Sequence, residues 1–280
     1  GQLGRSIQSE KPDHWKLVVT DAQTLDITNS ETVDQFFARN AFDLCINCAA
    51  YTAVDLAESN EELCYAVNSD GAGNIAKACA AVDCRLIHIS TDYVYHSDEG
   101  TPLTEESPTR PQSVYARSKL KGEQAVLEEH PEAIINRSSW IFSEFGKNFF
   151  LTMLRLARNG IIPRVVNDQL GTPTYARDLA RGLIAIEAKG MKGHGGVYNL
   201  SNSGETNWCD FASEIYHLEG ISEQPIPIPT SEYPTPAKRP PYSVMSMHKV
   251  SRTFGVELRS WREAVKDCHR RVAGKPAGNN

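Results

Sequence analysis

Short apolar segments with strand character alternate with longer helical patterns through the first half of the chain. The expected strands span 15–21, 42–50, 84–91 and 132–140. The helical patterns that separate them span 31–40, with Thr28 or Ser30 as its N-cap, 58–83 and 113–130. Strands separated by helices form parallel βαβ units, because each crossover is long enough to hold a helix. The alternation therefore predicts an α/β fold, a Rossmann-type doubly wound parallel sheet.

The chain opens on a glycine turn, "GQLGRSIQ", in which Gly1 and Gly4 match the end of the dinucleotide-binding fingerprint. In that fingerprint a strand leads into the glycines, and the pyrophosphate lies on the N-terminus of the helix that follows. We therefore expect a strand and a leading glycine, roughly ten residues, to be missing before Gly1. Segment 15–21 ends on Asp21, which matches the acid that binds the adenosine ribose of NAD. A simple turn acid is the competing interpretation.

The second half is less regular and predicts a smaller C-terminal α/β lobe. Strands are expected at 161–168 and 196–201, and helices at 148–160, 175–188 and 260–272. Dense prolines in 221–242 favour an ordered loop over a helix, and the tail 273–280 is expected to be frayed. We place an NAD(P)-binding Rossmann domain at 1–144 and a mainly substrate-binding lobe at 145–280. Within the lobe we expect 161–200 to return to the main sheet.

Charge and composition exclude several classes of function. The net charge is −6 at pH 7. The chain therefore lacks the excess of positive charge with which proteins bind nucleic acids or anionic membranes. No apolar run reaches the ~20 residues of a membrane helix, and the first residues show no signal-peptide pattern. Cys45 and Cys48 form a CxxC inside an expected strand, and we interpret them as buried thiols of a reducing, cytoplasmic protein. The histidines show no ligand spacing, so we expect no metal site.

Residues with acid–base chemistry follow the expected strand 84–91. Thr91 ends this strand, at the edge where open α/β sheets bind ligands. Tyr115 and Lys119 lie four residues apart on the next helix, and therefore on one face. The Lys119 ammonium is expected to lower the pKa of Tyr115 from about 10. Tyr115 can then protonate a carbonyl oxygen that Thr91 polarises, as a nicotinamide delivers hydride. The pattern is typical of an extended short-chain dehydrogenase/reductase.

Six segments carry a more specific resemblance. They are "NCAAYTAVDLAES", "STDYVY", "YARSKLKGE", "RSSWIF", "NDQLGTPT" and "YPTPAKRP". In this order and spacing they resemble the dTDP-4-dehydrorhamnose reductases over nearly the whole chain, from Gly1 to about Arg239. The resemblance implies reduction of dTDP-4-dehydro-L-rhamnose, a dTDP-linked 4-keto-6-deoxy sugar, to dTDP-L-rhamnose. The implied cofactor is NADH or NADPH.

The resemblance also implies roles for individual residues. Tyr115 corresponds to the catalytic acid, Lys119 to the partner that also holds the nicotinamide ribose, and Thr91 to the polarising hydroxyl. The residues expected to bind the cofactor are Gly1, Gln2, Leu3, Asp21, Asp26, Ile27, Ala49, Ala50, Tyr51, Tyr115 and Lys119. The residues expected to bind the nucleotide sugar are Val54, Thr91, Asp92, Tyr115, Trp140, Asn148, Gln169 and Arg239. Two of these have competing interpretations, Trp140 as a core residue and Arg239 as a solvated cation.

Two other functions compete with the reductase. One is a nucleotide-sugar epimerase or dehydratase, which would recycle its NAD and show no net consumption of NADH. The other is a regulatory subunit similar to the β subunit of methionine adenosyltransferase, against which the intact set of Thr91, Tyr115 and Lys119 argues. Some members of the resembled family hold a divalent ion at a dimer contact. We identify no such pattern here, and the sequence leaves a homodimer open without fixing the oligomeric state.

Overall fold

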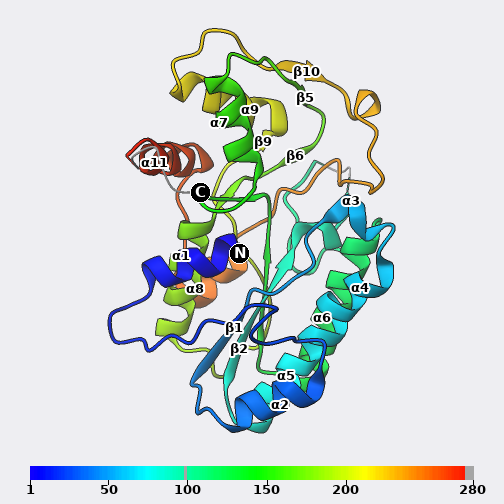
Figure 1. Ribbon diagram of the computed structural model, residues 1–280, viewed down its shortest axis with the longest axis vertical. Coiled ribbons are helices and arrows are strands. Elements are labelled where there is room, and N and C mark those ends of the chain that lie inside the picture. Colours follow the sequence, from blue (N-terminus) through cyan, green and yellow to red (C-terminus); the bar gives the residue numbers. More distant parts are fainter. Residues whose placement is uncertain (98–99, 275–280) are drawn as a thin grey trace.

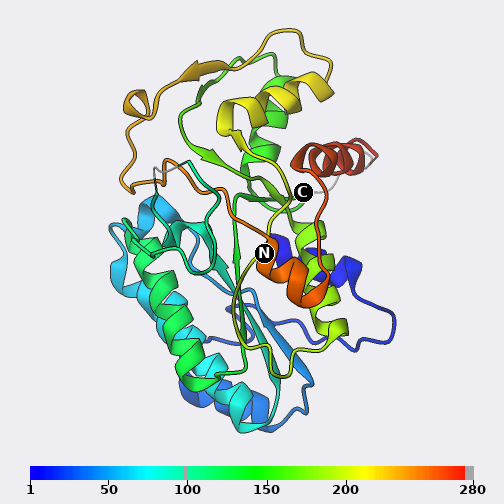
Figure 2. The same ribbon diagram turned by 180° about the vertical axis from the view of Figure 1, so that it is seen from behind.

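The computed structural model describes residues 1–97 and 100–274. A sheet flanked by helices forms the larger body, and a smaller group of helices and short strands lies beyond one end of that sheet (Figures 1 and 2). The part of the predicted tail from 275 to 280 lies outside the described residues. No helix within the described ranges combines the length and the apolar character of a membrane span.

The main sheet has four parallel strands in the order β1-β2-β3-β8. These are β1 (Leu44–Asn47), β2 (Arg85–Thr91), β3 (Ile134–Ser138) and β8 (Gly196–Asn199). All five residues of β3 are buried, as expected for a strand covered on both faces. The register pairs Thr91 with Ser138, so the carboxyl ends of β2 and β3 meet. The predicted parallel α/β sheet is confirmed.

Helices cover both faces of this sheet. One face carries α2 (Ser30–Ala38), α5 (Gly71–Ala81) and α6 (Val114–Glu129), and the other carries α1 (Gln2–Glu10), α8 (Ala176–Lys189) and α10 (His248–Phe254). Each helix layer buries an apolar cluster against the strands, with Leu86 and Ile135 on the first face and Ile87 and Ile134 on the second. The alternating faces of a strand explain why neighbouring residues belong to different clusters.

The smaller lobe has its own core. Its helices are α7 (Phe149–Arg158), α9 (Trp208–Leu218) and α11 (Trp261–Ala273), and its short strands are β5 (Arg164–Val166) and β10 (Ile226–Ile228), which pair in parallel. Phe142, Phe150, Phe211 and Trp261 centre its apolar cluster. Short two-residue strands link the lobe to the larger body: β4 (Ile141–Phe142), β6 (Leu170–Gly171), β7 (Thr174–Tyr175) and β9 (Thr206–Asn207).

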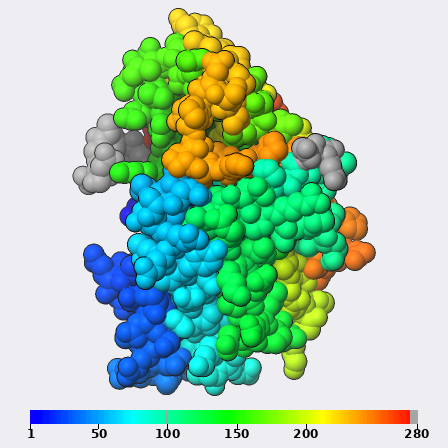
Figure 3. All heavy atoms as spheres, turned by 90° about the vertical axis from the view of Figure 1, so that its right-hand side faces the viewer, coloured from blue at the N-terminus to red at the C-terminus, as the bar shows by residue number. Residues whose placement is uncertain are grey.

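The segments 161–200 and 221–242 divide their residues between the two bodies. Within 161–200, β5 stays in the lobe, whereas α8 packs against α1 and β8 pairs with β3 of the main sheet. The proline-rich segment 221–242 contains the strand β10 and a single 3₁₀ turn, Thr230–Glu232, and no α-helix. Figure 3 shows its orange atoms directly above the cyan helices α3 (Val54–Ala57) and α4 (Glu61–Tyr65). The segment therefore bridges the lobe and the larger body.

The strand predicted at 15–21 is wrong, because no strand forms there. Leu17, Val18 and Val19 are 38%, 57% and 56% exposed. A strand needs a neighbour to pair its backbone groups, and this segment has none among the described residues. The next segment along the chain that does form a strand is β1, which lies at the edge of the main sheet and pairs with β2 alone.

The N-cap predicted for the second helix is also wrong. Asn29, rather than Thr28 or Ser30, caps α2, and its Oδ1 accepts the backbone N–H of Thr32 at 3.1 Å. Thr28 lies one residue before the cap position, and its hydroxyl donates to Asp26 Oδ1 at 2.7 Å. The helix predicted at 113–130 forms as α6, with the Ser113 hydroxyl as its cap.

The segment predicted to be mostly helical, 58–83, is mostly helical, in three consecutive pieces. It consists of α4, a π-helical turn (Ala66–Asp70) and α5. The π turn brings the carbonyl of Asn68 against α6, where a Cβ atom built on Gly122 would lie 2.0 Å from that oxygen. Glycine at 122 is therefore what allows α6 to approach this turn.

Candidate active site

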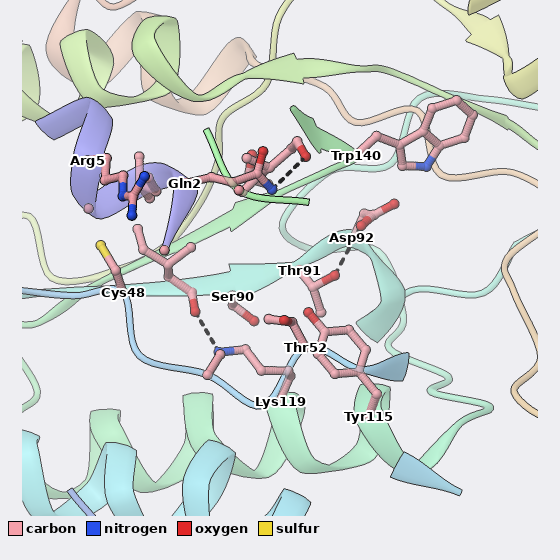
Figure 4. Close-up of a pocket in the computed structure, with 18 of the residues that line it drawn as sticks. Gln2, Arg5, Cys48, Thr52, Ser90, Thr91, Asp92, Tyr115, Lys119 and Trp140 are labelled. Carbon is pink, nitrogen blue, oxygen red and sulfur yellow. Dashed lines mark hydrogen bonds between the residues drawn. The ribbon is translucent and has the colours of Figure 1, made fainter. Parts of the chain in front are cut away.

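A pocket of about 500 Å³ opens at the carboxyl ends of β1, β2 and β3. The first residues of α1 form one wall, and the ends of β2 and β3 form the floor (Figure 4). Tyr115 and Lys119 reach it from α6, and Trp140 and Lys147 reach it from the segments that lead into the lobe. This is the edge at which open parallel sheets bind ligands.

Tyr115 and Thr91 line this pocket together, Tyr115 from α6 and Thr91 from the end of β2. Thr91 Oγ1 donates to Asp92 Oδ1 at 3.1 Å and accepts the backbone N–H of Tyr93 at 3.2 Å. Burial raises the pKa of Tyr115 to about 12. The predicted lowering of that pKa is wrong in this structure, because desolvation outweighs the favourable contact with Thr91. A neutral phenol at working pH is nonetheless the form that can donate a proton.

Lys119 lies one turn further along α6 and is 1% exposed. Its Nζ donates to the carbonyl of Ile89 at 2.6 Å and lies 3.3 Å from His88 Nε2. Burial lowers its pKa to about 8, against the opposing influence of Glu123. The two side chains thus line one pocket, as the i, i+4 spacing predicts, but the amine of Lys119 points toward β2 rather than to the Tyr115 hydroxyl (Figure 4).

Asp92 follows Thr91 at the end of β2 and also lines the pocket. Its side chain is buried, with the residue 2% exposed. None of the described residues hydrogen-bonds its Oδ2. Burial raises its pKa to about 7, although the nearby hydroxyls of Ser243 and Thr91 oppose the shift. Ser138 Oγ, also buried and in the pocket lining, likewise has no hydrogen-bond partner in the described ranges. Two buried polar atoms without partners at one cavity indicate a polar ligand.

The N-terminus of α1 fits an anionic group. No side chain in the described part of the chain caps this helix, and its first turn holds no acid. Arg5 and Lys147 line the pocket beside it. Free backbone N–H groups at a helix start, with cations nearby, suit the pyrophosphate of a dinucleotide. The pocket therefore fits a nicotinamide dinucleotide, with the diphosphate at α1 and the reactive end near Tyr115 and Lys119.

Gln2 orients this helix start through contacts across the pocket. Its Oε1 accepts hydrogen bonds from Ser143 Oγ and Asn148 Nδ2, both at 2.9 Å. Asn148 also caps α7 through its Oδ1. The structure thus gives Asn148 a positioning role at α1, in addition to the substrate contact that the sequence predicts.

Several predicted cofactor residues lie outside the pocket. The Asp21 carboxylate accepts hydrogen bonds from the backbone N–H groups of Gln23 and Thr24, at 3.1 Å each, within its own turn. Asp26 and Ile27 lie in the same region, before α2. Of the next predicted group, Ala50 lines the pocket, whereas Ala49 and Tyr51 do not. The roles of the residues outside the lining stay predictions.

Predicted substrate residues on the lobe side have protein partners. Trp140 stacks on Trp208 with ring centroids 3.7 Å apart and an interplanar angle of 11°. The Gln169 side-chain amide donates to Thr230 Oγ1 at 3.0 Å. Arg239 makes a two-pronged ion pair with Asp55, with Nη2–Oδ2 at 2.7 Å and Nη1–Oδ1 at 3.1 Å. Val54, at the start of α3, lies next to Asp55 and outside the pocket lining.

Sequence reasoning missed several pocket residues. They include Arg5, Cys48, Thr52, Ser138 and Lys147. Ser138 could have been found from its place at the end of the strand in "RSSW". Cys48 and Cys45 are free thiols as predicted. They are only partly buried, because the strand that ends between them is an edge strand.

A doubly wound parallel sheet with a Thr at the end of β2 and a Tyr–Lys pair one turn apart on the next helix defines a short-chain dehydrogenase/reductase type of oxidoreductase. The family model described as the RmlD substrate binding domain matches residues 1–273. The dTDP-4-dehydrorhamnose reductase of Mycolicibacterium smegmatis is 40% identical over 279 residues, which cover 98% of this chain and 84% of that protein. The enzyme of the same name from Mycobacterium tuberculosis is 40% identical over 273 residues, or 95% of this chain and 88% of the relative.

Solved structures agree with these relatives. A dTDP-4-dehydrorhamnose reductase from Clostridium acetobutylicum has a TM-score of 0.93 at 39% identity, covering 98% of this chain and 96% of that one. One from Bacillus anthracis, solved in complex with NADP, has a TM-score of 0.92 at 35% identity, covering 97% and 96%. A UDP-glucose 4-epimerase from Thermus thermophilus is 18% identical with a TM-score of 0.76, which shows the shared fold alone. The chain belongs to the dTDP-4-dehydrorhamnose reductase family.

Proposed function

We propose that this protein reduces dTDP-4-dehydro-L-rhamnose to dTDP-L-rhamnose at the expense of NADPH or NADH. The relatives at 40% identity carry the name of this activity, and the Bacillus anthracis structure contains NADP. The observation that carries the proposal is the convergence of Thr91, Tyr115 and Lys119 on one pocket that also holds the start of α1. An epimerase or a regulatory subunit would not need a net consumption of the reduced cofactor.

When bound, the nicotinamide supplies the hydride that reduces the sugar carbonyl. The protein's own groups then control the proton. Tyr115 is held as a neutral phenol by burial, so it can donate its proton to the oxygen on which negative charge develops. Thr91 lines the same pocket as Tyr115, and its hydroxyl can hold the same oxygen. We assign to Lys119, which lines the same pocket, the contact with the cofactor ribose and the return of a proton to Tyr115 after the transfer.

The substrate's other half fits the lobe side of the pocket. We place the sugar near Asp92 and Trp140, and the dTDP half near Asn148, Gln169 and Arg239. Asp92 offers an oxygen without a partner to a sugar hydroxyl. Asp55 takes one edge of the Arg239 guanidinium, through Nη1 and Nη2. The other edge, Nε with the second Nη2 hydrogen, is a planar pair of donors, the geometry that suits diphosphate. We further propose a cytoplasmic setting, which its seven free cysteines favour, and a homodimer, which light scattering would test.

The test is cofactor oxidation with enzymatically generated dTDP-4-keto-6-deoxy-L-sugar, measured for the wild type and for Tyr115→Phe. We expect turnover in the wild type and a loss of at least ~100-fold in the variant, with cofactor binding retained. Tyr93→Phe is the matched control, because its ring lies edge-on to Tyr115 at 5.8 Å outside the pocket lining. Absence of wild-type turnover while the dinucleotide still binds would contradict the proposal. Running the assay with both cofactors measures their preference.

A further inference from the structure

His88 lies behind Lys119, fully buried on β2 and outside the pocket lining. Its ring bridges two side chains, with Nδ1 3.1 Å from Asn47 Nδ2 and Nε2 3.3 Å from Lys119 Nζ. Asn47 belongs to β1 and pairs with His88 in the register of the sheet. This row of three residues connects an edge strand to the proposed active site, and the mechanism above does not use it.

The hydrogen bonds around Asn47 determine which nitrogen of His88 carries its proton. The backbone N–H of Ala49 donates to Asn47 Oδ1 at 3.1 Å. A backbone N–H can only donate, so the oxygen of the amide must face Ala49 and its NH₂ group must face His88. His88 Nδ1 is therefore an acceptor. Burial, and next the charge of Lys119, lower the pKa of His88 well below its usual value, so the ring is neutral and its single proton is on Nε2.

The His88 Nε2–H thus points at Lys119 Nζ. An N–H directed at an ammonium is repulsive, because both groups are donors, whereas the lone pair of a neutral amine accepts it. We propose that His88, oriented by Asn47, is a positioning residue that stabilises the neutral amine of Lys119 and so makes Lys119 an exchangeable proton carrier instead of a fixed cation. The inference rests on the proposed function, in which Lys119 serves Tyr115 and the cofactor.

The other groups around Lys119 do not fix its charge. Glu123, one turn further along α6, is held by Arg137 through hydrogen bonds of 2.9 and 2.6 Å. From the other elements Cys48 and Cys64 face Lys119, and burial raises the pKa of both thiols, that of Cys48 to about 12. Tyr115, one turn before it, is a neutral phenol. The only carboxylate among these neighbours of Lys119 is therefore already paired with Arg137, and the other groups are neutral. The pKa of Lys119 is lowered to about 8.

The decisive variant is Asn47→Asp. An aspartate has nearly the same shape and can still accept from Ala49, but its second oxygen would accept a proton from His88 Nδ1. The Nε2 lone pair would then face Lys119 and accept from its ammonium. We expect Lys119 to hold its proton to a pH higher by about one unit or more. His88→Phe, which removes the N–H, should shift the titration in the same direction.

The primary measurement is an NMR titration of the Lys119 side-chain amine in lysine-labelled protein without substrate, with the resonance assigned through Lys119→Arg. The basic limb of the pH profile of kcat/KM gives the second readout, and it should move upward with the titration. Ile87→Val is the control, since Ile87 is buried on the opposite face of β2. It should change neither midpoint.

The double variant Asn47→Asp with His88→Phe separates the tautomer from the added charge. If His88 transmits the effect, adding Asn47→Asp to His88→Phe moves the Lys119 midpoint much less than adding Asn47→Asp to the wild type. An unchanged Lys119 midpoint in both single variants, or an equally large effect of Asn47→Asp on the His88→Phe background, overturns the inference. A shifted titration in a protein that turns over no sugar nucleotide would support it and refute the proposed function.

Discussion

Asp92 illustrates how burial sets the charge of a single residue. Its folded-state pKa is about 7, above the value of about 3.9 expected in an unfolded chain. Between these values the folded state binds more protons than the unfolded state, so the free energy of unfolding falls as pH rises through this window. At higher pH the buried, charged carboxylate destabilises the fold.

We expect Asp92→Asn to remove this pH dependence, because the amide mimics the protonated acid. The variant should match the wild type near about pH 4 and become progressively more stable than it up to about pH 8. Urea unfolding at a series of pH values measures the difference. Asp34→Asn, at an exposed position of α2, is the control. A constant difference across the series would show that Asp92 titrates normally.

Single residues were predicted well from the sequence where spacing alone places them. Thr91, Tyr115 and Lys119 needed only a strand end and an i, i+4 pair, and the structure brings them to one pocket. The protonation of Tyr115 could not be predicted, because it depends on how deeply folding buries the phenol. His88 was missed because a lone histidine in a strand carries no spacing signal.

At the scale of elements, α6 depends on its close approach to the π-helical turn. Gly122→Ala would force a Cβ atom to 2.0 Å from the carbonyl oxygen of Asn68, so one of the two helices must move. We expect a loss of about 1–3 kcal/mol in the free energy of unfolding, measured in urea. Gly73→Ala on α5 is the control, since its Cβ would meet only the Ala125 methyl at 3.3 Å. An equal effect of both changes would contradict this account.

Elements with their own signals were predicted closely, and those that depend on a partner were not. The helix α6 has a capping serine and an apolar face, and α11 has a capping box from Ser260 and Glu263. Segment 15–21 has the apolar residues of a strand, but a strand exists only when a neighbour pairs with it. The short links between the bodies, β4, β6, β7 and β9, have two residues each and carry no periodic pattern.

At the scale of the whole molecule, the ion pair of Arg239 with Asp55 joins the proline-rich segment to α3 across the two bodies. If Arg239 also holds the diphosphate, Arg239→Gln should raise KM for the nucleotide sugar about tenfold or more. The KM for the reduced cofactor should stay the same. Initial-rate kinetics provide both values.

The matched control is Arg164→Gln, which breaks a surface ion pair with Glu232 inside the lobe. Exposed pairs of this kind contribute little, so its kinetics should resemble the wild type. Equal KM values for wild type and Arg239→Gln would show that Arg239 joins the two bodies through Asp55 and does not bind the substrate. The sequence placed Arg239 at a substrate site but could not reveal Asp55, since the two are 184 residues apart.

The stacked indoles of Trp140 and Trp208 give the protein an optical property of its own. Trp140 adopts a φ of 45°, uncommon for a bulky residue, and Gly171 leaves the space its ring occupies. Two indoles in face-to-face contact couple their electronic transitions, and one of this pair lines the pocket. Any ligand that moves Trp140 uncouples them, so circular dichroism and intrinsic fluorescence can follow occupancy of the site without an added label.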